Sequence, residues 1–349
     1  MKHGGDYVGY YDKYGKMPID YSENTSPFGL PIGVKSAICD SLDIANRYPD
    51  PYCRELRNKL ATYHNVPANS IICGNGAADI IYRLALALKP KKALVTAPTF
   101  SEYKSSLNLI GCEIINHALK EENDFKIDED IFSLIDDDLD VMYICQPNNP
   151  TGMTCEENLL LRILNKCRAD GVMLVVDECF LDFVEGGISL IPKLEEYDNL
   201  LILKAFTKLY AMAGVRLGYA ISASSYLLSK MRASGQPWNV STMAQAAGIA
   251  AMDEKDYVKR VISNTQKERR VIFDGLNKLE IRHIESEANY ILIYTESEDF
   301  AIKMEEKGFL IRDCSNYIGL DEGWYRIAVK KHEDNLKLLS AMEEVIIGK

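Results

Sequence analysis

The sequence predicts an α/β protein, with a large domain built on a mainly parallel sheet and a smaller α+β domain towards the carboxyl end. Three observations predict this fold. Short apolar runs alternate with helical patterns through the middle of the chain, each run ends in a turn, and the pattern changes after about Trp238. Alternating strands and helices favour a parallel sheet covered on both faces, because a helical crossover joins one parallel strand to the next.

Five apolar runs predict the strands of the large domain, and helical patterns lie between them. Functional side chains are expected in the loops that follow the carboxyl ends of parallel strands, which is where Asn149, Asp177 and Lys208 fall. The predicted strands are residues 92–97, 141–145, 172–176, 200–204 and 215–221, and the predicted helices include residues 79–88 and 156–169.

The chain of 349 residues is long enough for more than one domain. After Trp238 a long helical pattern at residues 241–278 is followed by strand candidates at residues 290–294 and 325–329. No repeat or flexible linker separates the two parts, so we expect them to pack closely. The predicted divisions are an N-terminal arm that packs with the small domain (1–45), the large domain (46–240) and the small domain (241–349).

Composition excludes several classes of protein. The chain is 47% hydrophobic and 26% charged, as globular proteins are, and its net charge of -11 disfavours nucleic acid as a partner. The sequence lacks a run of about 18 apolar residues and a signal-peptide pattern, so we expect no membrane span and no export. The nine cysteines lie at none of the short spacings typical of metal sites. A cytoplasmic protein with free thiols and no metal is expected.

Lys208 gives the most informative local pattern. It follows an apolar run, small residues and glycine come next, and Arg216 lies eight positions later. This pattern suits an amine that forms a Schiff base with an aldehyde cofactor, with a cation nearby to hold the cofactor's phosphate.

Four other motifs each allow a structural and a functional interpretation. Residues 74–79 form either an ordinary strand–turn–helix connection or an anion site at a helix N-terminus. Phe100 either packs in the core or stacks on a heteroaromatic ring. Asn149 lies in a turn, where its amide can also bind a ligand oxygen. Asp177 ends a very apolar strand, so it is either a cap or the partner of a protonated ring nitrogen.

Taken in order, the motifs resemble those of the fold-type I pyridoxal-phosphate enzymes of the aspartate aminotransferase superfamily, over nearly the whole chain. The motifs are Gly-Asn-Gly (74–76), Pro-Thr-Phe (98–100), Asn-Asn-Pro-Thr-Gly (148–152), Asp-Glu (177–178), Thr-Lys (207–208) and Gly-Val-Arg-Leu-Gly-Tyr (214–219). The resemblance implies pyridoxal 5′-phosphate as cofactor and a homodimer.

The resemblance also implies a role for each matching residue. Lys208 would form the Schiff base, Asp177 would pair with the ring nitrogen, Asn149 would bind the phenolic oxygen, and Phe100 would stack on the ring. Arg326 would clamp a substrate α-carboxylate with two parallel hydrogen bonds. The residues implied around the cofactor phosphate are Asn75, Gly76, Ala77, Thr207, Arg216 and, from the neighbouring subunit, Tyr48.

Two residues depart from the pattern. Many relatives have a tyrosine where this chain has Phe180 and a serine where it has Ala205. Both changes argue against a standard aspartate aminotransferase. The family often has cis peptide bonds before proline, and Ala97–Pro98 and Asn149–Pro150 are the candidates here.

Within the superfamily the chain resembles histidinol-phosphate aminotransferases and the threonine-phosphate decarboxylases of cobalamin biosynthesis, which both act on anionic phosphates. The segments His3-Gly4-Gly5, 236–240 and 311–321 favour the decarboxylases, with the aminotransferase activity as the alternative. The resemblance implies that His3, from the neighbouring subunit, and Arg312 hold a distal phosphate, although Arg312 could instead pair with Asp313. Asn24 and Asn149 are further expected substrate ligands.

The expected reaction converts L-threonine O-3-phosphate to (R)-1-aminopropan-2-yl phosphate. With both ends of the substrate held, the bond to Cα that stands perpendicular to the cofactor ring breaks: C–COO⁻ gives decarboxylation, and C–H begins transamination. Serine phosphate differs by one methyl group and stays an open alternative. The proton donor to Cα also stays open, with Lys208 as the candidate. Transcription regulators share this fold, but they need a DNA-binding module, and we expect none here because the motifs begin close to Met1 and the chain is acidic.

Overall fold

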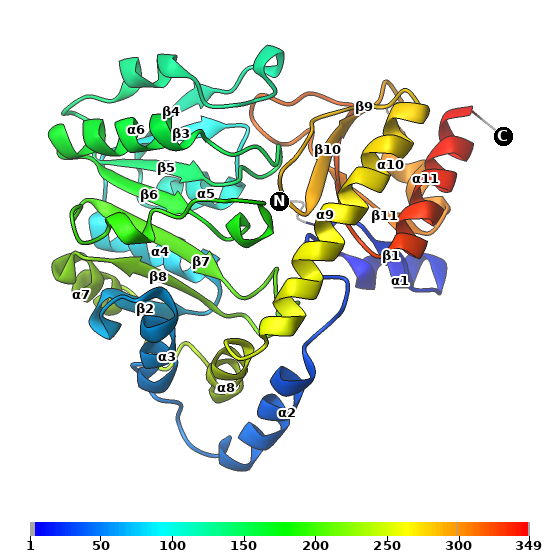
Figure 1. Ribbon diagram of the computed structural model, residues 1–349. Helices are drawn as coiled ribbons and strands as arrows, with labels where there is room; N and C mark the ends of the chain where they lie inside the picture. The colour runs from blue at the N-terminus through cyan, green and yellow to red at the C-terminus, as the bar shows by residue number, and fades with distance from the viewer. Residues whose placement is uncertain (1–3, 298, 348–349) are drawn as a thin grey trace.

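The computed structural model describes residues 4–297 and 299–347, which form a large α/β part and a smaller α+β part (Figure 1). The large part contains a seven-stranded sheet in which only β8 runs against its neighbours, so the predicted mainly parallel sheet is confirmed. In spatial order the strands are β2 (Ile71–Gly74), β8 (Gly218–Ser222), β7 (Leu200–Ala205), β6 (Met173–Asp177), β5 (Val141–Cys145), β3 (Lys92–Ala97) and β4 (Glu113–Ala118).

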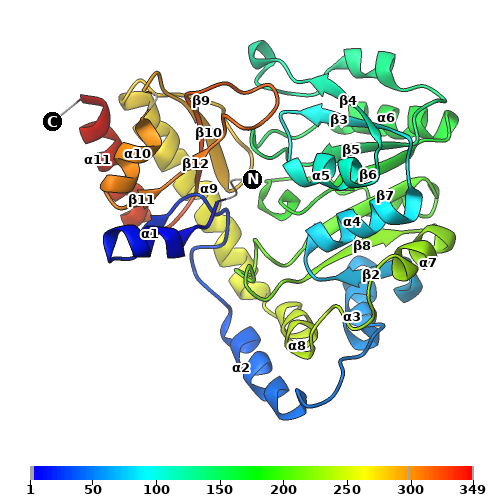
Figure 2. The ribbon, with the colours of Figure 1, turned by 180° about the vertical axis from the view of Figure 1, so that it is seen from behind.

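The central strands are continuous apolar runs because both faces of the sheet are covered. Every residue of β5 is buried, as are all but the first of β6 and all but the last of β7. Figures 1 and 2 show α4, α5 and α7 on one face and α6 on the other. These helices are α4 (Ala77–Leu88), α5 (Ser101–Leu109), α6 (Glu157–Ala169) and α7 (Ser225–Ala233), and α3 (Arg54–His64) packs beside β2.

The predicted strand at residues 215–221 is wrong at its start, because β8 begins only at Gly218. Arg216 has a φ of 62°, in the left-handed region, which an extended strand does not allow. The long helical pattern at residues 241–278 also forms two helices, α8 (Thr242–Ala251) and α9 (Lys255–Lys278), separated by a short turn.

The smaller part has an antiparallel sheet with helices packed against it. A separate two-stranded sheet pairs β1 (Ile19–Asp20) in parallel with β11 (Phe309–Leu310), and Tyr10 in α1 (Tyr7–Tyr14) donates a hydrogen bond to the Glu305 carbonyl at 3.1 Å. Helix α1 and strand β1 therefore pack with the small part. The sheet order is β12 (Arg312–Asp313), β13 (Trp324–Ala328), β10 (Tyr290–Tyr294) and β9 (Arg282–His283), beside α10 (Phe300–Glu306) and α11 (His332–Ile347).

Helix α9 joins the two cores. Tyr257 and Val261 near its beginning belong to the core of the large sheet, whereas Ile272 and Leu276 belong to the core of the small part. Helix α2 (Ile32–Ser41) packs on α8, which is also part of the larger core. The exact domain boundaries stay a prediction.

Two further expectations concern the backbone and the membrane. Ala97–Pro98 is cis, as predicted, but the second cis bond is Gln146–Pro147 and not Asn149–Pro150. The cis and trans forms before proline differ by only about 0.5–1 kcal/mol, so the sequence did not distinguish these two neighbouring bonds. Among the residues described, no helix combines the length and the apolar character needed to cross a bilayer.

Candidate active site

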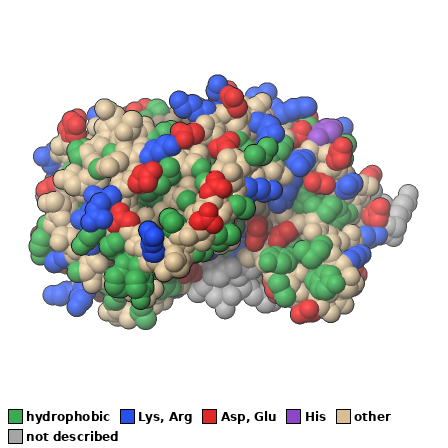
Figure 3. Space-filling model, turned by 90° about the horizontal axis from the view of Figure 1, so that it is seen from below, with side chains coloured by type: hydrophobic (Ala, Val, Ile, Leu, Met, Phe, Trp, Pro, Cys, Tyr) green, Lys and Arg blue, Asp and Glu red, His purple; other side chains and the backbone are tan. Residues whose placement is uncertain are grey.

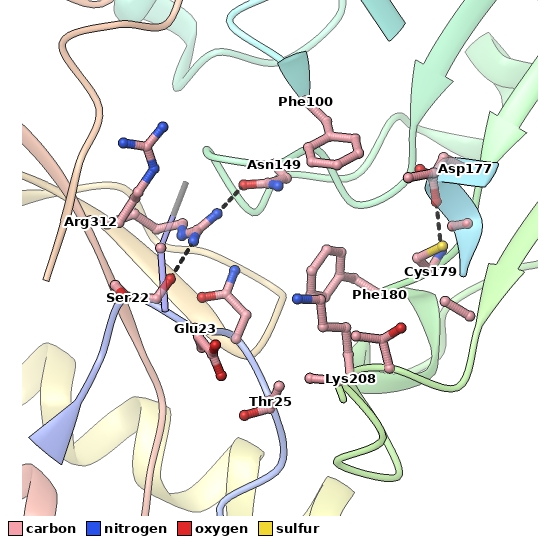
Figure 4. Close-up of a pocket in the computed structure, with 18 of the residues that line it drawn as sticks. Ser22, Glu23, Thr25, Phe100, Asn149, Asp177, Cys179, Phe180, Lys208 and Arg312 are labelled. Carbon is pink, nitrogen blue, oxygen red and sulfur yellow. Dashed lines mark hydrogen bonds between the residues drawn. The ribbon is translucent and has the colours of Figure 1, made fainter. Parts of the chain in front are cut away.

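A cavity of about 550 Å³ lies between the edge of the large sheet and the small part, and it is lined by residues from both (Figure 4). Phe100 follows β3, Asn149 follows β5, Asp177 ends β6 and Lys208 follows β7. Because β8 runs in the opposite direction, Arg216 just before it lies at the same edge of the sheet. The topology thus brings five predicted site residues together, and all five line the cavity.

Lys208 points into this cavity, with its Nζ 5.7 Å from the centre of the Phe180 ring. Burial, together with the charges of the nearby Arg326 and Arg216, lowers the pKa of Lys208 to about 8, and the charge of Glu23 acts against this shift. An amine with a lowered pKa is more often neutral near pH 7 and is therefore a better nucleophile than an ordinary lysine.

The Lys208 loop is tied to the segment that follows β1. The backbone N–H of Ser26 donates to the Lys208 carbonyl at 2.9 Å. This contact fixes the loop from outside the large sheet, so the position of the amine depends on residues far away in the sequence.

Asp177 is a buried carboxylate with both oxygens engaged. Tyr103 donates its hydroxyl to Oδ2 at 2.6 Å, and the backbone N–H of Cys179 donates to Oδ1 at 3.0 Å. Burial raises the pKa of Asp177, while the hydrogen bonds from Cys179 and Tyr103 act to lower it. Since Asp177 also lines the cavity, it can accept one more donor there.

The N-terminus of α4 and Arg216 form a positive region at the cavity. Gly76 caps this helix with a φ of 88°, and a Cβ there would lie 2.7 Å from Nη2 of Arg216. Ala77, in the first turn of α4, lines the cavity, as does Thr207. Free N–H groups at a helix start and a neighbouring guanidinium are suited to a phosphate group.

Asn75 does not line the cavity, and its backbone N–H donates to the Asp79 carboxylate at 3.0 Å. Asn239 donates to the same carboxylate oxygen at 2.7 Å. Asp79 therefore shapes the turn between β2 and α4. Its carboxylate would compete with a phosphate for the N–H of Asn75.

Two buried arginines face each other across neighbouring strands of the small part. Arg312 in β12 and Arg326 in β13 are direct partners in the antiparallel register, and each is 6% exposed. Like charges at such positions repel. Within the described chain neither arginine forms an ion pair with a carboxylate, so both guanidinium groups are available to an anionic ligand.

Arg326 is held by amide and carbonyl oxygens at the cavity. It donates to Oδ1 of Asn149 at 2.5 Å and to the carbonyl of Ser22 at 2.8 Å. With the Asn24 amide turned so that its oxygen faces Arg326, that oxygen accepts from Nη1 and Nε at 3.3 Å. The three predicted substrate ligands Asn24, Asn149 and Arg326 therefore lie together.

Arg312 bonds to the backbone carbonyl of Asp313 at 2.5 Å and to Oδ1 of Asn316 at 2.9 Å. The alternative pairing with the Asp313 carboxylate is thus absent from the described contacts. The Arg312 guanidinium also lies 5.4 Å from the centre of the Tyr317 ring, and both residues line the cavity.

The N-terminal arm reaches the cavity of its own chain. Gly4 lines the cavity, and the N–H of Gly5 donates to the Ser22 hydroxyl at 2.8 Å. A Cβ on Gly4 would collide with the carbonyl of Ser22, and a Cβ on Gly5 with the carboxylate of Glu23. Glycine at both positions therefore allows this close approach. His3 lies outside the described residues, so its predicted role is untested.

Tyr48 is not brought to the cavity within one chain. It is 80% exposed and stacks on Trp238 with 4.6 Å between ring centres. Ser22, Glu23 and Tyr103 also belong to the site or contact it, and the sequence did not predict them. None of these lies in a motif, and each is recognised only from its contacts with site residues.

The model of the family "Aminotransferase class I and II" matches residues 16–342. The threonine-phosphate decarboxylase of Salmonella typhimurium is 35% identical over 333 residues, which are 95% of this chain and 92% of that protein. The histidinol-phosphate aminotransferase structure from Clostridium acetobutylicum has a TM-score of 0.89 at 30% identity and covers 95% of this chain and 99% of that one. The L-threonine-O-3-phosphate decarboxylase structure from Porphyromonas gingivalis has a TM-score of 0.85 at 25% identity and covers 95% and 100%.

Proposed function

The chain belongs to the family of class I and II aminotransferases and is a pyridoxal 5′-phosphate-dependent enzyme, and on this premise we propose that it decarboxylates L-threonine O-3-phosphate. The product is (R)-1-aminopropan-2-yl phosphate, made for cobalamin biosynthesis. The observation that carries the proposal is the pair Arg312 and Arg326. Two buried cations that have no carboxylate partner among the described residues suit a substrate with an anionic group at each end.

The residues of the cavity fit the cofactor. They provide an amine of lowered pKa at Lys208, a buried carboxylate at Asp177, and a cationic region where Arg216 meets the N-terminus of α4. Bound pyridoxal phosphate supplies an electron sink for the bond that breaks at Cα of the substrate.

We assign the cofactor contacts as follows. Lys208 would bind the aldehyde, Asp177 would pair with the ring nitrogen, Asn149 would bond to the phenolic oxygen, and Phe100 would cover one face of the ring. The phosphate of the cofactor would be bound by Ala77, Thr207, Arg216 and the turn formed by Asn75 and Gly76. Tyr48 of a second subunit would complete this phosphate site.

The substrate is then held at two ends. Arg326, supported by Asn24 and Asn149, binds the α-carboxylate, and Arg312 together with His3 binds the distal phosphate. Holding both ends removes rotational freedom and decides which bond of Cα is presented for cleavage. After CO₂ leaves, Cα needs a proton. We assign its delivery to Lys208, whose Nζ points into the same cavity.

A substrate panel tests this function. We expect CO₂ release from threonine phosphate, with serine phosphate slower because the pocket loses contact with one methyl group, and free threonine at least about 10²-fold slower because the contact with Arg312 is missing. The measurements are CO₂ release and product NMR, with cofactor-free protein as the control. Histidinol phosphate with 2-oxoglutarate is the competing substrate, and its amino transfer as the faster reaction would overturn the proposal.

We further propose that the enzyme is a two-fold dimer, in which Tyr48 completes the neighbouring cavity. Large apolar side chains are exposed near Tyr48 and on α2, among them Trp238 at 44% and Ile32 at 87%. Figure 3 looks at the side towards which α2 projects in Figure 1, and apolar side chains lie exposed there among charged ones.

Light scattering is expected to give twice the mass of one chain. Tyr48→Ala is expected to weaken pyridoxal phosphate binding by about 10-fold, the value of one hydrogen bond to a charged group. Tyr226→Ala is the control, because Tyr226 is also exposed, at 69%, but lies on α7. An active species of one chain would contradict the dimer.

A further inference from the structure

Tyr103 contacts the functional site without lining the cavity. It lies in α5, is fully buried, and donates its hydroxyl to Oδ2 of Asp177 at 2.6 Å. A hydrogen bond from a neutral hydroxyl to a carboxylate is short and strong, because the acceptor is charged. Tyr103 thus bonds to Asp177 from the side of α5. The side of Asp177 that lines the cavity stays accessible to a ligand.

The Tyr103 ring is fixed from two sides. It stacks on Tyr143 of β5 with 5.0 Å between ring centres, and it meets the Phe100 ring edge-on at 5.6 Å. Packing against these two rings keeps the Tyr103 hydroxyl directed at Asp177. One side chain therefore positions both the carboxylate and the aromatic ring that we assign to the cofactor.

We propose that Tyr103 is a positioning residue that holds Asp177 ionised and correctly oriented for the ring nitrogen of pyridoxal phosphate. This inference rests on the cofactor role proposed for Asp177. Burial alone favours the neutral form of Asp177. In that form the carboxyl group carries the proton and cannot stabilise a protonated ring nitrogen by its charge. The hydrogen bond from Tyr103 favours the carboxylate and offsets this effect.

Other groups around Asp177 also influence its charge. Burial raises the pKa of Asp177, and the groups that act to lower it are Cys179, Tyr103 and, through its charge, Lys204. Burial also keeps the pKa of the Tyr103 phenol well above its usual value, so the phenol remains a donor at working pH. The titratable groups facing Asp177 from the surrounding elements are Tyr103, Cys145, Cys179, Lys204 and Tyr290.

Two stacked tyrosines give a matched experiment. Tyr103→Phe removes the hydroxyl bonded to Asp177, whereas Tyr143→Phe removes a buried hydroxyl that has no hydrogen-bond partner in the described structure. The cofactor-free protein is titrated with pyridoxal phosphate from pH 5 to 9. Tyr103→Phe is expected to weaken binding by about 10-fold or more, and Tyr143→Phe by less than about twofold.

The pH dependence gives a second readout. Without the Tyr103 donor the pKa of Asp177 rises further, so Tyr103→Phe is expected to lose cofactor affinity at a higher pH than the wild type as the solution is acidified. If Tyr103→Phe, Tyr143→Phe and the wild type all lose cofactor affinity at the same pH on acidification, the inference is overturned.

A double-mutant cycle separates positioning from packing. In Asp177→Asn, the further change Tyr103→Phe is expected to alter cofactor affinity by less than about twofold, since the charged acceptor is already gone. An equal loss in both backgrounds would show a purely structural effect and overturn the inference. A wild-type protein that does not bind pyridoxal phosphate would instead overturn the proposed function.

Discussion

Replacing Lys208 with alanine is expected to lower turnover by about 10⁴-fold and to abolish covalent attachment of pyridoxal phosphate. The change removes both the nucleophile and the proposed proton donor. The protein should still fold, because a buried amine is costly to charge, and among the described residues Nζ of Lys208 forms no hydrogen bond or ion pair that its loss would break.

The measurement combines steady-state turnover with borohydride reduction of the loaded protein and mass mapping of the labelled peptide. Wild-type protein should carry the label on Lys208, and Lys208→Ala should carry none while still binding the cofactor reversibly. The unchanged Arg216 and Ala77 explain this remaining affinity. Label on another lysine, or turnover that survives the substitution, would contradict the assignment.

Replacing Arg312 with alanine is expected to reduce kcat/KM for threonine phosphate by roughly 10²–10³-fold, the cost of removing one partner of a buried charged contact. The slow reaction of free threonine should change by less than about threefold, because it lacks the phosphate that Arg312 is proposed to bind.

Arg326→Ala is the matched comparison, since Arg326 lies directly opposite on the next strand. It should impair both substrates, because both carry the α-carboxylate. Thermal unfolding of each variant controls for stability, and relief of the repulsion between the two guanidinium groups should limit any loss. An equal loss for both substrates in Arg312→Ala would refute the distal-phosphate role.

The sequence predicted the strand-end residues of the site well. Strands β3 and β5 have the predicted bounds, because continuous apolar runs between turns are distinctive in a covered parallel sheet. Once the order of such strands is known, the residues after their ends must meet at one edge. Asn149, Asp177 and Lys208 were found for this reason.

Contacts that depend on the packing of separate elements were not predictable in this way. Tyr103 contacts Asp177 only because of the way α5 packs on the sheet, and no sequence motif predicts that packing. Ser22 and Glu23 lie next to a strand of only two residues, which has too little pattern to detect. The opposition of Arg312 and Arg326 follows from a strand register that the sequence does not reveal.

The segment after β1 has a consequence for chimeric proteins. Arg326 of the small part bonds to the Ser22 carbonyl, Asn289 donates to the Asn24 carbonyl at 2.9 Å, and Ser26 bonds to the Lys208 loop of the large part. A graft that exchanged only the carboxyl-terminal third with a relative would alter the first two of these contacts, because Arg326 and Asn289 both lie in that third. Residues 19–26 belong functionally with that third and should be transplanted together with it.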